Sequence, residues 1–218
     1  MARQIMSETD AFSDEIVQHF PTTFMRRRHR DTGELNKQLR RFLLDMEKSG
    51  RNKIAGTSNL GGFHSDTKLL NHDLPAIREL REMITQGIFA FVRPLIQAEC
   101  SAPPENMKLT LWGWCTIMRQ GDYNEQHLHP EANVSGTYYV ATPEGMRNTK
   151  DDQPYGRISF VDPRPRADAM RLPNQVSAHA INPEPGDMVL FPSYYEHAVA
   201  PFKGPGVRIC IAFNARID

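Results

Sequence analysis

Residues 208–214, with the sequence Arg-Ile-Cys-Ile-Ala-Phe-Asn, have two clearly different faces. Ile209, Ile211 and Phe213 form an apolar face, and the side chains between them form a more polar one. Because successive side chains of a strand point to opposite faces of a sheet, this pattern predicts an antiparallel strand with one face in a core. We expect the apolar face to lie against helices. Arg208 then points into the interior of a barrel, where a charged side chain needs a partner.

The region before this strand is a series of short strand candidates, each bounded by glycine, proline, asparagine or aspartate. The candidates cover residues 108–118, 127–129, 135–141, 157–161, 187–191 and 207–214. Many short strands joined by turns rich in glycine and proline are typical of a β-barrel or jelly roll. The sequence therefore predicts a mainly β fold from about residue 107 onward.

Helical periodicity dominates the part of the chain before residue 107. Apolar residues repeat at helical spacing over residues 31–50, and again over residues 73–98, where Pro75 falls in the first turn. Between them, residues 58–66 contain two adjacent glycines and several short polar residues, which is typical of a loop. We expect one domain over residues 1–218, with residues 1–106 packed as a mainly helical part on the β core.

Composition excludes several classes of protein. The chain has 218 residues, a formal net charge of zero and a pI near 7.1, which argues against nucleic acid or an anionic membrane as the main partner. No apolar run approaches the roughly 20 residues that span a bilayer. The N-terminus lacks the apolar core of a signal peptide. Three cysteines suit a reducing cytoplasm better than a disulfide framework.

The basic run at residues 26–30 is the strongest local concentration of positive charge. We interpret it as a solvated face, with nucleic-acid binding as the minor alternative. The oligomeric state stays open, and a homodimer is compatible with the sequence.

Three histidines form the strongest candidate for a chemical site. His127 and His129 are one residue apart, and His197 lies in the later stretch Tyr-Tyr-Glu-His-Ala-Val. On a strand, residues i and i+2 share a face, so the first two can bind one metal ion, with His197 reaching it from a distant strand. Such ligands on one face of an iron ion leave positions open for substrate and oxygen. Arg208 would bind an anion beside the metal. His64 is interpreted as structural, although its glycine loop also allows an approach to a ligand.

Residues 107–214 resemble the iron(II)- and 2-oxoglutarate-dependent dioxygenases. The motifs that carry the resemblance are His-Leu-His-Pro at 127–130, Ser-Gly-Thr-Tyr-Tyr at 135–139, Asp-Pro-Arg at 162–164 and Phe-Pro-Ser at 191–193. These motifs look like those of a bacterial and phage branch of such oxygenases. The resemblance implies a double-stranded β-helix, a cupin-like jelly roll, with helices packed on one sheet. It also implies iron(II) as the metal and 2-oxoglutarate as the cosubstrate.

The resemblance implies roles for single residues as well. The three histidines align with the metal ligands, and Arg208 aligns with the arginine that binds the far carboxylate of 2-oxoglutarate. Cys210 stands where members of the family often have a small polar residue that contacts the cosubstrate. Thr137 and Tyr139 share a strand face and would hydrogen-bond the same molecule. For Cys210 and Tyr139, packing in the core is an equally good interpretation.

One position departs from the family pattern. His129 stands where the family has a carboxylate ligand, which leaves the site one charge more positive. Glu131 is the alternative third ligand, but its spacing from His127 places it past Pro130 and off the strand. We therefore expect His127, His129 and His197 to bind the metal.

The leading interpretation is an oxygenase that hydroxylates a C–H bond of an unidentified small molecule or peptidyl residue. The alternative is a cupin-like metal-binding protein that binds or isomerises a small polar ligand without oxygenase chemistry. Residues 186–197 have the spacing of the second cupin motif, and three histidines suit zinc or nickel as well as iron. Arg208 distinguishes the two, because a cupin does not require it.

Overall fold

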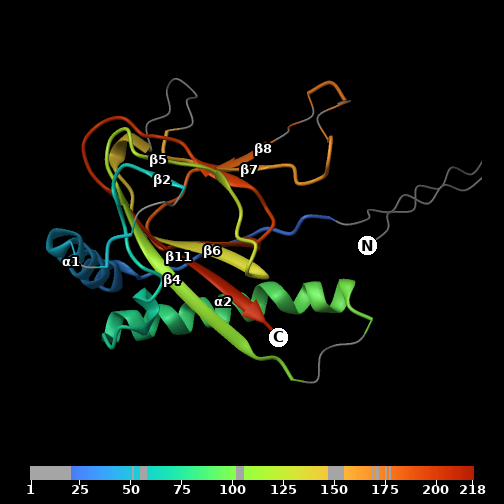
Figure 1. Ribbon diagram of the computed structural model, residues 1–218, viewed down its shortest axis with the longest axis horizontal. Coiled ribbons are helices and arrows are strands. Elements are labelled where there is room, and N and C mark those ends of the chain that lie inside the picture. The colour runs from blue at the N-terminus through green and yellow to red at the C-terminus, as the bar shows by residue number, and fades with distance from the viewer. Residues whose placement is uncertain are drawn as a thin grey trace, which may run out of the picture.

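The computed structural model describes residues 21–218 apart from residues 51, 55–57, 102–105, 147–154, 168, 170–171, 175 and 177. The N-terminal segment that was examined for a signal peptide lies outside the described residues. Two antiparallel sheets face each other, and two long helices lie on the outer side of one of them (Figure 1). None of the described helices is long and apolar enough to cross a membrane.

The larger sheet contains six strands within the described part of the chain. Their spatial order is β1 (Met25–Arg28), β9 (Asp187–Pro192), β6 (Val134–Ala141), β11 (Arg208–Ile217), β4 (Leu109–Met118) and β3 (Phe63–His64). β11 is antiparallel to both of its neighbours, so the strand predicted from its alternating faces lies inside the sheet.

The smaller sheet has five strands among the described residues. Their order is β2 (Asn59–Leu60), β5 (Tyr123–His127), β10 (His197–Val199), β7 (Ile158–Val161) and β8 (Ala178–Ile181). The two sheets together form the double-stranded β-helix that the resemblance implied. Five of the strands, β1, β2, β3, β8 and β10, have two to four residues each and were not among the strand candidates.

The helices have nearly the predicted bounds. α1 spans Gly33–Ser49 and ends at Gly50, whose φ of 62° is in the left-handed region that glycine adopts without strain. α2 spans Pro75–Glu99, with the proline in its first turn. Two short 3₁₀ helices, η1 (Leu69–Asn71) and η2 (Glu144–Met146), lie in the connections.

Two hydrophobic cores lie on opposite faces of the larger sheet. The outer core joins the buried stripes of α1 and α2 to Ile209, Ile211 and Phe213, which confirms the predicted contact of this face with the helices. The inner core lies between the sheets and includes Phe160 and Phe191. Because the faces of β11 alternate, packing of the isoleucines on the helices turns the intervening side chains of this strand toward the space between the sheets.

A buried acid fixes the edge strand β1. Asp187, which is 2% exposed, accepts hydrogen bonds from Nε of Arg26 at 3.2 Å and Nη2 of Arg26 at 2.5 Å, and Nε of Arg28 lies 3.6 Å from its other oxygen. Two arginines of the basic run therefore pair with the β-helix core. The interpretation of this run as a simple solvated face was incomplete.

Candidate active site

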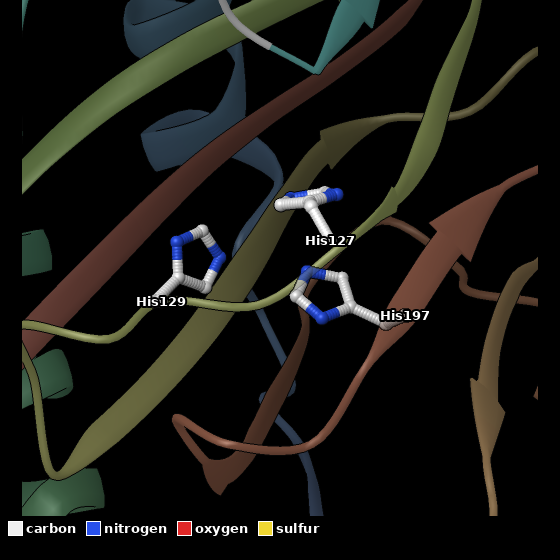
Figure 2. A group of neighbouring side chains, drawn as sticks. All are labelled: His127, His129 and His197. Carbon is white, nitrogen blue, oxygen red and sulfur yellow. The ribbon is translucent and has the colours of Figure 1, made fainter.

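The three histidines converge on one cavity, which is also lined by residues of the larger sheet. His127 is the last residue of β5 and lies directly opposite His197, the first residue of β10. The ligand atoms of His127, His129 and His197 all lie within 4.8 Å of one another. Figure 2 shows the three rings turned toward a common point. Ligand atoms on one face of a metal ion, each roughly 2.0–2.2 Å from it and about 90–110° apart, lie roughly 2.8–3.6 Å from one another. The three rings therefore have to move together by about 1 Å to hold an ion.

The prediction that His127 and His129 share one strand was wrong in detail, because β5 ends at His127. The main-chain N–H of His129 donates to the carbonyl oxygen of Ser193 at 3.0 Å, in the turn between β9 and β10. Pro130 follows and has no N–H to continue the ladder. The strand therefore stops, and His129 approaches the other two rings from an irregular segment.

Backbone hydrogen bonds select the tautomers of two of the rings. Nδ1 of His127 lies 2.7 Å from the carbonyl oxygen of Glu125, and Nδ1 of His197 lies 3.0 Å from that of Tyr195. A carbonyl oxygen only accepts, so both Nδ1 atoms carry the proton and both Nε2 atoms keep a free lone pair. This is the arrangement in which a second hydrogen bond orients a metal-binding imidazole.

The environment keeps the imidazoles neutral. Burial, reinforced by the neighbouring His127, lowers the pKa of His129 to about 4. Burial and the charges of His127 and His129 lower the pKa of His197 to about 3, against the opposing effect of its bond to Tyr195. The pKa of His127 is also lowered, mainly by burial. Neutral imidazole is the form that binds a metal ion, so no proton has to be removed near neutral pH.

Arg208 lies on the inner face of the larger sheet, lines the same cavity as the three histidines, and is only 1% exposed. Its Nη1 is 3.2 Å from Sγ of Cys210 and 3.8 Å from Sδ of Met118, and its Nη2 is 3.5 Å from the hydroxyl of Tyr139. Its buried Nε has no hydrogen-bond partner, and among the described residues no carboxylate forms a salt bridge with it. A buried guanidinium surrounded by sulfur atoms and a phenol therefore has donors that remain available to an anion.

The other residues predicted for the cosubstrate gather around this arginine. Thr137 and Cys210 line the same cavity as Arg208 and the three histidines. Tyr139 is fully buried, and its ring centre lies 5.1 Å from the guanidinium carbon. Sγ of Cys210 lies 2.9 Å from Oγ1 of Thr116.

Eight residues that line this cavity were not predicted as part of the site, among them Trp114, Thr116 and Asn124. Trp114 and Thr116 belong to β4, where they pair with Ala212 and Cys210 of β11. Their strand was recognised in the sequence, and its alternation places both side chains on one face. The pairing with β11 is what identifies that face as the inner one, and this pairing was not evident from the sequence.

Glu131 and His64 take no part in the metal cluster. Glu131 is exposed, and the group of ligand atoms formed among the described residues contains the three histidines without it. His64 is buried, and its Nδ1 lies 2.7 Å from the carbonyl oxygen of Ser65. The close approach permitted by Gly61 and Gly62 is to Asp122 and to the backbone of Ile117 in this chain.

Comparison with known proteins agrees with this geometry. Residues 113–214 match a protein-family model described as "Putative 2OG-Fe(II) oxygenase". A search of curated protein sequences gives no significant match.

Solved structures with the same fold include a prolyl-4-hydroxylase of Pseudomonas putida, which is 16% identical with a TM-score of 0.61, covering 89% of this chain and 93% of that one. A prolyl hydroxylase of Trichoplax adhaerens, solved with a peptide fragment of hypoxia inducible factor, is 15% identical with a TM-score of 0.54, covering 88% and 83%. HygX of Streptomyces hygroscopicus, solved with nickel and 2-oxoglutarate bound, is 12% identical with a TM-score of 0.51, covering 89% and 83%.

Proposed function

Because the chain belongs to the superfamily of iron(II)- and 2-oxoglutarate-dependent oxygenases, we propose that it hydroxylates a C–H bond with iron held by His127, His129 and His197. One observation carries the proposal. The cavity that contains three neutral imidazoles also contains Arg208, a buried cation without a carboxylate partner among the described residues. A dicarboxylate that reaches from the metal to this arginine provides a ligand for the metal at one end and an anionic partner for the guanidinium at the other.

Arg208 anchors the cosubstrate. Its guanidinium pairs with the far carboxylate of 2-oxoglutarate in a charge-assisted, bidentate manner, which also satisfies its free Nε or Nη donors. The hydroxyl of Tyr139 lies beside the guanidinium and donates to the same carboxylate. Thr137 and Cys210 form the walls along which the carbon chain extends toward the metal.

The histidines hold the metal and set its charge. Three neutral ligands leave the full double positive charge of iron(II), which strengthens the binding of a dianionic cosubstrate compared with a site that contains a carboxylate. When bound, the iron supplies oxygen activation, so that oxygen, 2-oxoglutarate and a substrate C–H bond give succinate, carbon dioxide and an alcohol. The protein positions the reactants and keeps water from the cavity.

The substrate that we propose is a small molecule or a residue of a polypeptide, and neither nucleic acid nor a membrane is part of the proposal. The zero net charge supports this choice. Cys100, Cys115 and Cys210 are all free thiols, which supports a reducing compartment, the cytoplasm, as the site of action.

Anaerobic titration tests the function directly. Iron(II) is added to the metal-free protein, and 2-oxoglutarate is then added while the visible metal-to-ligand charge-transfer band is followed. We expect a band that saturates with one equivalent of each in the wild type and is absent in the variant Arg208→Met, which keeps all three histidines. Iron binding without any band would favour the cupin-like alternative, and a protein that binds no iron would refute the assignment of the histidines.

A further inference from the structure

The three histidines are held in different ways. Nδ1 of His127 donates to Glu125, and Nδ1 of His197 donates to Tyr195, so the orientation of each of these rings is fixed by the backbone. Among the described residues, no hydrogen bond to the ring of His129 is formed. His129 also lies beyond the end of β5, so strand pairing does not fix its direction. Rotation of an imidazole about its second side-chain torsion is broad unless packing limits it. Something else must hold this ring.

Among the described residues, the aromatic rings beside His129 are those of His127, His197 and Trp114, and only Trp114 is not itself a candidate ligand. The indole of Trp114 has its centre 5.7 Å from that of His129, with an angle of 55° between the planes. The ring of His64 stacks on the same indole at 5.8 Å and 16°. Nδ1 of His64 donates to the carbonyl oxygen of Ser65 at 2.7 Å. A chain of contacts therefore leads from the backbone after β3, through His64 and Trp114, to His129.

Burial makes this chain of contacts stiff. Trp114 and His64 are each only 9% exposed, and each comes from a strand of the larger sheet. His64 lies opposite Thr116 in the pairing of β3 with β4, so Trp114 is its diagonal neighbour on the same face. Diagonal neighbours in a sheet are within reach of aromatic side chains. The positions of the two rings are thus set by the register of β3 against β4.

The geometry points to Trp114 as the positioning residue of His129, with His64 fixing the indole in turn. This inference rests on the proposed function, because it concerns His129 as a metal ligand. Packing against Trp114 therefore orients the ring of His129, as hydrogen bonds to the backbone orient the rings of His127 and His197. A ligand that is oriented before the metal arrives binds more tightly, and loss of such support typically lowers metal affinity by about 10- to 100-fold.

A double-mutant cycle tests whether Trp114 acts through His129. Iron(II) affinity is measured by anaerobic competition with a chromophoric chelator for the wild type, Trp114→Leu, His129→Leu and the double variant. We expect Trp114→Leu to weaken binding by about tenfold or more in the wild type and to have no effect when His129 is already leucine. Trp112→Leu is the matched control, since Trp112 lies two residues away on the same face of β4 and does not line the cavity.

Variants of His64 test the same series of contacts from its other end. His64→Leu should weaken iron binding less than Trp114→Leu does, and His64→Phe, which keeps a ring over the indole, should restore the affinity. The melting temperature of each metal-free variant shows that the protein is folded. A loss from Trp114→Leu that is undiminished in the His129→Leu background, or one matched by Trp112→Leu, would overturn the inference while leaving the iron site intact. A wild type that binds no iron would overturn the proposed function as well.

Discussion

Replacing Arg208 with methionine should make the metal-free protein more stable while removing its response to 2-oxoglutarate. Arg208 is buried, and its charge has no carboxylate partner among the described residues. Methionine keeps much of the apolar length of the side chain and brings no charge into the space between the sheets. The substitution therefore separates what this residue costs in folding from what it contributes to binding.

The magnitude follows from the contacts of the guanidinium. Nε has no partner, and the Nη atoms contact two sulfur atoms and one hydroxyl at 3.2–3.8 Å, which are weak contacts. A buried donor without a partner costs about 1–3 kcal/mol, so Arg208→Met should raise the free energy of unfolding by about that amount. In a protein of this size each kcal/mol corresponds to roughly 2–4 °C in melting temperature.

Urea and thermal unfolding with a chelator present measure this difference, and Arg216→Met on the exposed part of the same strand is the control. Unfolding is then repeated with nickel(II) and saturating 2-oxoglutarate. A ligand at 100 times its dissociation constant stabilises the folded state by about 2.7 kcal/mol, which the wild type should gain and Arg208→Met should not. A metal-free Arg208→Met protein that is less stable than the wild type would refute the reasoning, because the arginine would then have a favourable partner in the folded chain.

Three further predictions concern the histidines and the contact of α1 with the sheet. His129→Leu should lose iron(II) affinity by at least about tenfold, whereas His129→Asp should retain binding, and anaerobic chelator competition on both variants decides whether His129 is a ligand. The metal-free protein should lose stability as the pH falls below about 6.5 toward the pKa values of about 4 for His129 and about 3 for His197, because the unfolded chain binds protons that the folded chain excludes. Urea unfolding at pH 7 and pH 5 measures this loss, which should shrink in His129→Leu. Tyr138→Phe should cost about 1–2 kcal/mol in urea unfolding, since it removes the buried 2.8 Å hydrogen bond to Asn36, and an unchanged midpoint would show that Asn36 finds another donor.

The parts of the fold that could be predicted from the sequence are those whose pattern is local. The alternation in β11 predicted both its strand conformation and the contact of Ile209 with the helices, and both are confirmed. β10 has three residues, which is too short for a period of two to be visible. Its conformation comes from pairing with β5 and β7, which are far away in the sequence.

The difference between local patterns and long-range pairing also decides which residues of the site could be predicted. His127, His129 and His197 could be selected because histidines at this spacing are rare and chemically distinctive, although their assignment to iron stays a prediction. Trp114 and Thr116 could not, since a tryptophan or threonine in a strand is ordinary. Their place in the cavity depends on the register of β4 against β11, which brings residues about 95 positions apart to opposite sides of one ladder.

The position of β11 between β4 and β6 has a consequence for how the protein is made. Both neighbours of β11 precede it in the chain, so while a ribosome is still translating residues 208–217, the facing edges of β4 and β6 have no strand between them. Unpaired edges of this kind attract other chains. The larger sheet therefore closes only after β11 has left the ribosome. Arg208 is part of the same strand, so the cavity that contains Arg208 and the three histidines is among the last features of the molecule to form.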